Sequence, residues 1–257
     1  MPLSPSLEEI KKFWPEKAPD INIVQKYVSK YENEKIVIKY GGNVLIDRKV
    51  FNNFISDINV LNKLGLSIIV VHGGGPRIKR ELEKKKIVSK FINGLRVTDK
   101  NIINTVEEVL IDFNNDIVDS LQKLGSDAAS FHTKDKNLIE VTPERKELGF
   151  VGIPEKININ VIEEALSKNR IPIIAPLGLD KNNQTYNING DTAASAIAKK
   201  LKARRLILMT NVEGVYDDNK KLIPEIKPFD LENLIKWNIV AEGMIPKIEN
   251  CVDAVEN

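Results

Sequence analysis

Two lysines occupy positions from which they could act on a phosphoryl group. Lys39 ends an apolar run just before a glycine turn, and Lys247 follows Gly-Met-Ile-Pro at the start of a predicted helix. Ammonium groups placed in this way could neutralise charge on a phosphoryl group during its transfer. Lys247 would oppose the helix dipole, a locally unfavourable charge that hints at function. Taken alone, Lys39 also fits a solvated lysine at a strand end.

Four further polar side chains lie just before or at the start of predicted helices. Asp191 opens an alanine-rich helix, where it could be the N-cap or could hold two lysines in place. Asn187 and Asn189 alternate along a predicted strand, so both could face one cleft. Arg96 carries a planar fork that suits a carboxylate, although it also fits a surface salt bridge.

Two glycine turns follow two apolar strands, at Gly41-Gly42 and at residues 73–75. Several N–H groups in such a turn could bind one phosphate at the mouth of a parallel sheet. Neither turn is a P-loop or a dinucleotide-binding fingerprint. Each turn by itself fits a ligand-free connection between a strand and a helix better.

The apolar pattern predicts an alternation of strands and helices in the first half of the chain. Strands are expected at residues 35–40 and 67–71, each followed by a helix, the second of which begins at Pro76. This rhythm predicts a parallel sheet with right-handed crossovers. A longer helix is expected after Thr98.

The middle of the chain, about residues 126–155, has a different pattern. Short β-like pieces at 128–131, 138–141 and 148–151 are separated by polar turns, and we interpret them as hairpins that cover a site. The alternation then returns: the remaining predicted elements are a helix near 160–168, strands at 171–175, 185–188 and 205–209, the alanine-rich helix and a final helix.

The two ends of the sequence are both expected to be helical. Apolar residues at the start predict an amphipathic helix interrupted at Pro15, which either folds back on its own core or forms a partner-binding arm. At the other end, the apolar stripe of the last helix is still in phase at Val255, without a glycine cap or a closing strand. We therefore expect the complete protein to continue beyond residue 257.

The composition is that of an ordinary soluble protein. The 257 residues are 42% hydrophobic and 29% charged, with a net charge of +2 and mixed signs along the chain. This balance gives no indication of a nucleic-acid or membrane partner. The single cysteine, Cys251, cannot form an internal disulfide, and the N-terminus lacks the apolar segment of a signal peptide. A cytoplasmic protein is expected.

Taken together, six motifs resemble the amino acid kinase family, and most closely those members that phosphorylate N-acetyl-L-glutamate in arginine biosynthesis. The motifs are VIKYGG at residues 37–42, VVHGGGP at 70–76, NGLRVT at 93–98, LGFVG at 148–152, YNINGDTAA at 186–194 and EGMIPK at 242–247. They occur in the family's order and with similar spacing over residues 35–257.

The resemblance implies an α/β fold, a three-layer αβα sandwich with a mainly parallel central sheet and β-hairpins over the substrate site. Residues 1–33 would form a kinked helix for oligomerisation, and residues 34–257 the kinase domain. Within that domain, about 34–178 would bind the acceptor and about 179–257 the nucleotide, with the last lobe incomplete. A homo-oligomer is implied, a dimer or a hexamer joined through the N-terminal helices.

The resemblance also assigns roles to single residues. Lys39 and Lys247 would flank the phosphoryl group transferred from ATP, and Asp191 would organise both lysines. The remaining site residues are Gly41, Gly42 and Gly74 for phosphate, Gly74, Gly75, Arg96 and Asn187 for the acceptor, and Thr210, Asn211, Gly214, Val215, Tyr216, Gly243 and Met244 for the nucleotide. Mg²⁺ would be held by the nucleotide phosphates, without protein ligands. The acceptor carboxylate is already a nucleophile, so no base is needed, and we interpret His72 and His132 as structural.

Two positions depart from the family pattern. Asn211 replaces a usual aspartate, which bears on the nucleotide contact, and Gly190 replaces a usual alanine. Other acceptors remain open, first among them carrier-linked aminoadipate, and then carbamate, aspartate or UMP. A non-catalytic amino-acid sensor is the alternative from another class, and the joint presence of Lys39, Asp191 and Lys247 argues against it.

Overall fold

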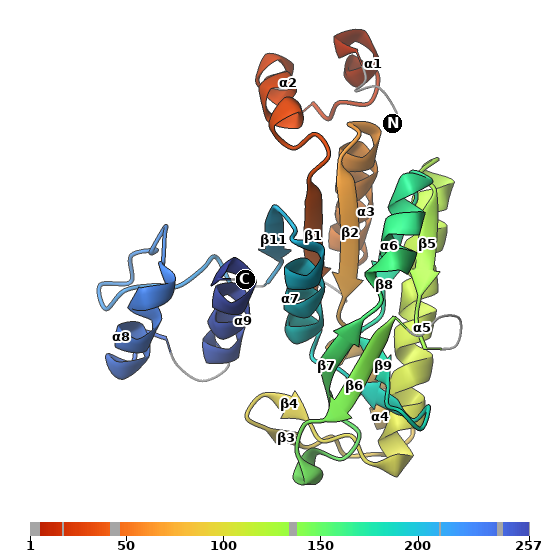
Figure 1. The fold of residues 1–257 in the computed structure, drawn as a ribbon, viewed down its shortest axis with the longest axis vertical. Helices are drawn as coiled ribbons and strands as arrows, with labels where there is room; N and C mark the ends of the chain where they lie inside the picture. The colour runs from red at the N-terminus through yellow and green to blue at the C-terminus, as the bar shows by residue number, and fades with distance from the viewer. Residues whose placement is uncertain are drawn as a thin grey trace.

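A five-stranded, fully parallel sheet forms the centre of the molecule in the computed structural model (Figure 1). The structure describes residues 6–16, 18–41, 47–133, 138–210, 212–240 and 244–256. The strand order is β11-β1-β2-β8-β5. The bounds are β1 Lys35–Tyr40, β2 Ser67–His72, β5 Ala128–Phe131, β8 Ile171–Ile174 and β11 Arg205–Leu208.

The central strands are apolar on both faces because helices cover both sides of the sheet. Alternate residues of β1 enter different cores: Ile36 and Ile38 face one side, and Val37 faces the other. The first core is covered by α3 (Arg48–Lys63) and α5 (Lys100–Lys123), and the second by α6 (Ile159–Ser167) and α7 (Gly190–Leu201). The predicted three-layer αβα sandwich is thereby confirmed.

The register of β1 and β2 brings the two glycine turns together. Tyr40 is paired with His72, so both strands end at the same edge of the sheet. Gly73 N–H donates to the Tyr40 carbonyl at 2.7 Å. A Cβ on Gly73 would lie 3.5 Å from the Gly41 Cα, which shows how closely the two backbones approach.

A second, smaller sheet and a short hairpin lie beyond this edge (Figure 1). The small sheet has the order β10-β9-β6-β7, with bounds β6 Ile139–Pro143, β7 Gly152–Ile157, β9 Leu177–Leu179 and β10 Thr185–Asn187. The hairpin pairs β3 (Phe91–Ile92) with β4 (Leu95–Arg96), and α4 (Gly75–Lys84) precedes it. β6 and β7 form the antiparallel hairpin that the sequence predicts in this region.

Two details of the predicted middle segment are wrong. The piece at 128–131 belongs to the central sheet, where it pairs in parallel with β8. Nearly all of its residues are buried. A buried run of four apolar residues has the same sequence pattern in the central sheet as in a hairpin, so the pattern alone could not assign it. The piece at 148–151 is not a strand but contains the end of a 3₁₀ turn, η2 (Lys146–Leu148), and isolated bridges. Gly149 is required there, because its φ is +69° and a Cβ would meet the Thr98 carbonyl oxygen at 2.5 Å.

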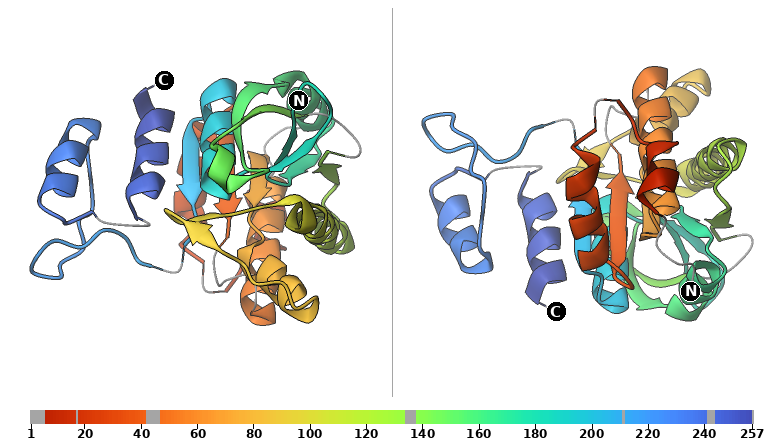
Figure 2. Two further views of the ribbon diagram at one scale, coloured as in Figure 1. Left: turned by 90° about the horizontal axis from the view of Figure 1, so that it is seen from below. Right: turned by 90° about the horizontal axis from the view of Figure 1, so that it is seen from above.

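The N-terminal helices pack on the protein's own core. These helices are α1 (Leu7–Lys11) and α2 (Ile21–Lys30), and Figure 2 shows them across the end of the sheet opposite the glycine turns. Ile10, Val24 and Val28 are buried in the cluster that also contains the core face of α3. Ile23 and Tyr27 on α2 are about half exposed. The arm therefore keeps one apolar face on the core and presents two large apolar side chains outward.

The C-terminal segment extends to one side of the sandwich. In Figures 1 and 2, α9 (Ile245–Glu256) lies beside α7, and α8 (Leu231–Lys236) lies farther out. The hydroxyl of Ser195 on α7 donates to the Asn250 carbonyl at 2.7 Å, and Lys199 pairs with Asp253 at 2.9 Å. Within the described ranges, no helix is long and apolar enough to cross a membrane.

Candidate active site

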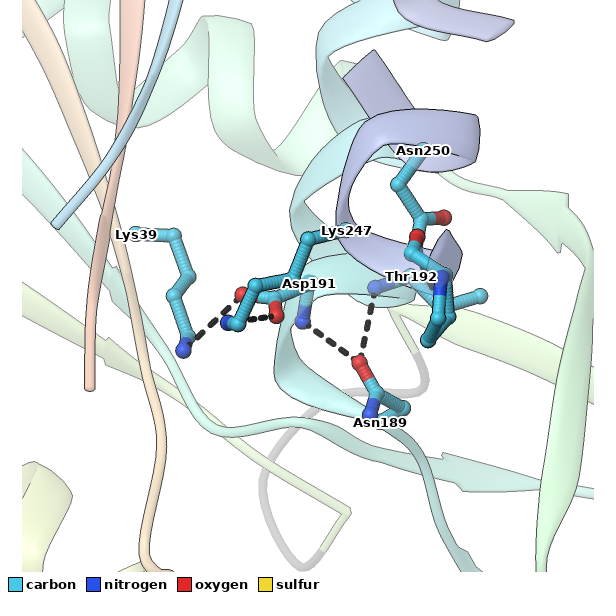
Figure 3. Close-up of polar contacts among 7 residues, drawn as sticks. Lys39, Asn189, Asp191, Thr192, Lys247 and Asn250 are labelled. Atoms are coloured by element: carbon cyan, nitrogen blue, oxygen red, sulfur yellow. Dashed lines mark hydrogen bonds and ion pairs between the residues drawn. The ribbon is translucent and has the colours of Figure 1, made fainter. Parts of the chain in front are cut away.

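Lys39, Asp191 and Lys247 come together at the carboxyl edge of the central sheet (Figure 3). Asp191 Oδ1 lies 2.9 Å from Lys39 Nζ, and Asp191 Oδ2 lies 2.6 Å from Lys247 Nζ. The Lys39 and Asp191 side chains are 9% exposed, whereas that of Lys247 is 31% exposed. One carboxylate therefore holds two ammonium groups, one on each oxygen.

Three different elements supply these side chains. Lys39 is the next-to-last residue of β1, Asp191 lies in the first turn of α7, and Lys247 lies in the first turn of α9. The N-cap of α7 is Asn189, whose side chain accepts from the N–H groups of Asp191 and Thr192 at 2.8 and 3.2 Å. Asp191 is therefore not the cap, and its carboxylate is free to face the lysines.

The electrostatics of the triad leave a net positive charge. Burial alone would raise the pKa of Asp191, but the Lys39 charge and the hydrogen bond from Lys247 outweigh it, so the pKa is lowered. Asp191 is ionised at neutral pH, and two cations face one anion. A partly desolvated site with one unbalanced positive charge attracts an anionic ligand.

A cavity of about 210 Å³ opens beside this triad. Its wall combines backbone of the second glycine turn, polar side chains and apolar side chains. The lining residues are Lys39, Gly73, Gly74, Gly75, Pro76, Ile78, Phe91, Gly94, Leu95, Arg96, Leu110, Val151, Pro176, Asn187, Ile188, Asn189, Gly190 and Asp191. The predicted acceptor residues Gly74, Gly75, Arg96 and Asn187 thus meet in one cavity that reaches Lys39 and Asp191.

Arg96 lies in the cavity wall with its side chain buried. Its guanidinium donates to the Gly75 carbonyl at 3.2 Å and to the Ser89 hydroxyl, and it lies 4.7 Å from the centroid of the Phe91 ring. Burial lowers its pKa. Arg96 is 8% exposed, so the alternative of a surface salt bridge is wrong, and no carboxylate in the described part of the chain pairs with it. A buried guanidinium without a counter-ion is suited to an anionic ligand.

Close packing explains the small residues around Lys39. A Cβ on Gly41 would collide with the Lys39 ammonium, and a Cβ on Gly74 would collide with Leu110. A Cβ on Gly190 would lie 3.2 Å from Lys39 Cε, a tight contact that the side chain could relieve by a small shift. The lysine thus lies in a channel between backbones, which limits its rotamers.

The predicted nucleotide residues lie apart from this cavity. Gly214, Val215 and Tyr216 form one side of a turn closed by the Tyr216–Leu222 bridge and by the bond from Ile223 N–H to the Val215 carbonyl at 2.8 Å. Thr210 follows β11, and Met244 directly precedes α9. None of these five lines the cavity of Arg96. Asn211, Gly243 and Gly42 lie outside the described residues.

Some contributors to the site escape sequence reasoning. Ser89 and Phe91 contact the Arg96 guanidinium, yet β3, which Phe91 begins, is too short to show an alternating pattern. The only local signal for this hairpin is its Asn93-Gly94 turn. Asn250 ties α9 to its own first turn by donating to the Pro246 carbonyl at 2.7 Å. The only sequence signal for this contact is that Asn250 follows Pro246 by four residues on one predicted helix, and such a spacing is a weak signal.

The fold and the lysine–aspartate–lysine site define a class of small-molecule kinases that lack a P-loop. The chain belongs to the amino acid kinase family, whose profile matches residues 34–257. It is 52% identical over 250 residues to an acetylglutamate kinase of Pelagibacter ubique, covering 97% of this chain and 87% of the relative. An acetylglutamate kinase of Rhodospirillum centenum is 40% identical over 266 residues, covering 98% of this chain and 87% of the relative.

Among solved structures, the Streptococcus mutans protein smu.665 is 35% identical with a TM-score of 0.78, covering 86% of this chain and 90% of that one. An N-acetylglutamate synthase from Neisseria gonorrhoeae has a TM-score of 0.81 at 19% identity, covering 93% of this chain and 56% of that one. At that identity the likeness concerns the fold alone. As a family member, the protein is an ATP-dependent kinase.

The charge balance of the triad predicts a specific pH dependence for Asp191→Asn. Removing the carboxylate leaves two ammonium groups facing each other, so the free energy of unfolding should fall by about 3 kcal/mol at neutral pH. Because the folded-state pKa of Asp191 is lowered, its contribution is complete above its unfolded value and is lost as pH falls through the folded value.

Urea unfolding of both proteins from about pH 8 to about pH 3 measures this difference. We expect it to be constant down to about pH 5 and to shrink only below about pH 4. A difference that already closes near pH 6 would mean that burial, not the lysines, dominates the pKa of Asp191.

Proposed function

We propose that this protein transfers the γ-phosphoryl group of ATP to the side-chain carboxylate of N-acetyl-L-glutamate, giving N-acetyl-L-glutamyl 5-phosphate in arginine biosynthesis. One observation carries the proposal: a cavity with the buried guanidinium of Arg96 in its wall reaches Lys39 and Asp191, and Asp191 in turn holds Lys247. An acidic molecule bound to Arg96 would have its second carboxylate near the two ammonium groups. The acetylglutamate kinases among its relatives support this choice of acceptor.

The proposed roles follow from the charge that the reaction must handle. An oxygen of the acceptor carboxylate attacks the γ-phosphorus, and the bond from that phosphorus to the bridging oxygen of ADP breaks. Both reactants are anions, so their approach must be offset by fixed positive charge. Lys39 and Lys247 would supply this charge, and Asp191 would hold them before substrate binds. The carboxylate is deprotonated at neutral pH, so the reaction requires no general base.

The acceptor would be held at both ends. Arg96 would bind its α-carboxylate through two parallel hydrogen bonds, and Asn187 would donate to a polar oxygen of the same molecule. The apolar wall, which includes Leu95, Leu110 and Val151, suits the methyl and methylene groups. A volume of about 210 Å³ fits a small acid of this kind.

MgATP would enter as the second substrate. As in the family that the chain belongs to, Mg²⁺ would be carried by the nucleotide phosphates. The backbone N–H groups of Gly41, Gly42 and Gly74 would bind phosphoryl oxygens. Thr210, Asn211, Gly214, Val215, Tyr216, Gly243 and Met244 would contact the rest of the nucleotide.

We also propose that the protein is a cytoplasmic homo-oligomer. The exposed Ile23 and Tyr27 on α2 support an interface through the N-terminal helices, which would join dimers into a hexamer. The use of ATP and the single cysteine support a cytoplasmic location.

An acceptor panel tests the proposed reaction. We expect hydroxylamine to trap an acyl phosphate, with matching ADP release, when the protein receives MgATP and N-acetyl-L-glutamate. Carrier-linked aminoadipate, carbamate, aspartate and UMP are the competing acceptors. Turnover with only one of these competing acceptors would identify that molecule as the substrate and would contradict the assignment of N-acetyl-L-glutamate. Nucleotide binding without turnover on any acceptor would support a sensor instead.

Lys247→Ala tests the role of the ammonium group on α9. Loss of one preorganised positive charge should lower kcat by at least about 100-fold, with little change in the KM for ATP. Lys200→Ala removes an exposed lysine of α7 and should leave kcat unchanged. An equal kcat for the two variants would remove Lys247 from the mechanism.

Arg96→Ala tests the acceptor site. Loss of a buried guanidinium that binds a carboxylate should cost about 2 kcal/mol or more, which raises the KM for N-acetyl-L-glutamate roughly 30-fold. The matched control is Arg80→Ala, which removes an exposed arginine of α4. If only the KM for ATP rises in Arg96→Ala, the assignment of this cavity to the acceptor is wrong.

A further inference from the structure

His72 is a fully buried polar side chain that the proposed reaction does not use. It is the last residue of β2, and the turn of Gly73, Gly74 and Gly75 follows directly. Its ring packs edge-on against Phe113 on α5, with centroids 5.0 Å apart. Both ring nitrogens nevertheless have polar partners, so the side chain is more than a space-filling group.

The partners of the ring determine which nitrogen carries the proton. Asn114 Nδ2 lies 3.2 Å from His72 Nε2 and donates to the Ile173 carbonyl at 2.9 Å, while the Ser130 hydroxyl donates to Asn114 Oδ1 at 2.6 Å. These contacts fix the orientation of the Asn114 amide, because a flipped amide would place its oxygen against the Ile173 carbonyl. The nitrogen of that amide can only donate, so His72 Nε2 accepts and the proton resides on Nδ1.

The second ring nitrogen contacts the glycine turn. His72 Nδ1 lies 2.9 Å from the Gly73 carbonyl oxygen, to which the Nδ1–H donates. Burial, together with the nearby Arg77 charge, outweighs this hydrogen bond and lowers the pKa of His72 to about 4, so the ring is neutral at physiological pH. The only protonation state that satisfies both neighbours is therefore the neutral Nδ1–H tautomer.

This hydrogen bond sets the direction of one peptide plane in the active site. In a trans peptide the carbonyl and the following N–H point in opposite directions, so fixing the Gly73 carbonyl against His72 turns the Gly74 N–H away from the ring. Gly73 N–H is already held by the Tyr40 carbonyl. Gly74 lines the cavity beside Lys39, so its N–H is the group whose direction depends on His72.

We propose that His72, held by Asn114 as the Nδ1–H tautomer, is a positioning residue that aims the Gly74 N–H at the transferring phosphoryl group. The inference rests on the proposed function, since it is that reaction which needs a donor at Gly74. Without the Nδ1–H, the Gly73–Gly74 peptide could rotate, because glycine on both sides restricts it little.

Two variants separate positioning from packing. In His72→Asn the side-chain amide nitrogen can take the place of Nδ1 and donate to the Gly73 carbonyl. In His72→Gln the amide reaches the place of Nε2 and keeps the contact with Asn114, but the donor to Gly73 is lost. Both remove the ring from the same site, so their melting temperatures should fall by similar amounts.

We expect kcat for N-acetyl-L-glutamate phosphorylation to be at least about tenfold lower in His72→Gln than in His72→Asn, with the KM values within about threefold. Equal losses of kcat in the two variants, tracking their melting temperatures, would show a packing role only and would overturn the proposal.

The tautomer is measured separately by ¹⁵N NMR of histidine-labelled protein. The proposal requires a protonated Nδ1 and an unprotonated Nε2 from about pH 6 to about pH 8. His132→Gln assigns the second histidine signal. A protonated Nε2 would overturn the proposal even in a fully active enzyme. If wild-type protein turns over no acceptor while the NMR shows the expected tautomer, the proposed function fails and the His72–Asn114–Gly73 network stands.

Discussion

The architecture of the site depends on one electrostatic constraint, which is that two ammonium groups must be held close together with little water. Two such groups repel each other strongly at low dielectric. Asp191 makes the arrangement stable because each of its oxygens faces one lysine. The net charge of the three side chains is positive, so the site favours the binding of an anion. The proposed substrates, a nucleotide and a carboxylate, are both anions.

The parallel sheet is what brings these groups into contact. Its strands end together, so Lys39 on β1 lies beside the glycine turn after β2. The N-terminus of α7 lies against the same edge, and the side chain of Asn189 caps this helix, leaving the Asp191 carboxylate for the lysines. Gly41 and Gly190 pack against the Lys39 side chain so closely that it has few alternative positions. The central strands therefore determine the geometry of the charges as well as the core.

The parallel sheet could be predicted from the alternation of apolar strands and amphipathic helices, whereas the three-layer arrangement was implied by the resemblance to the amino acid kinase family. Lys39 and Arg96 could be singled out as candidates, since a charged residue at a strand end or before a helix differs from its apolar neighbours, but their roles were implied by the family resemblance. The place of residues 128–131 could not, because four apolar residues carry no information about which strand they pair with. The cap of α7 was uncertain for a similar reason: Asn189 and Asp191 are both good capping residues, and only the backbone selects between them. The placement of Phe91 beneath Arg96 depends on the β3–β4 hairpin, whose turn is Asn93-Gly94 with positive φ at both residues. This dipeptide is a local signal for a hairpin, but it does not indicate that the hairpin brings Phe91 and Arg96 together.

In the proposed reaction, Lys39 and Lys247 would lie on either side of the phosphoryl group during its transfer, with Asp191 holding both ammonium groups. The most direct measurement is a crystal structure with Mg²⁺, ADP, tetrafluoroaluminate and N-acetyl-L-glutamate, in which the planar fluoride complex takes the place of the transferring group. We expect both ammonium nitrogens to lie within hydrogen-bonding distance of the fluorides, with the Asp191 carboxylate still between the lysines. A complex bound elsewhere, or one contacted by neither lysine, would contradict it.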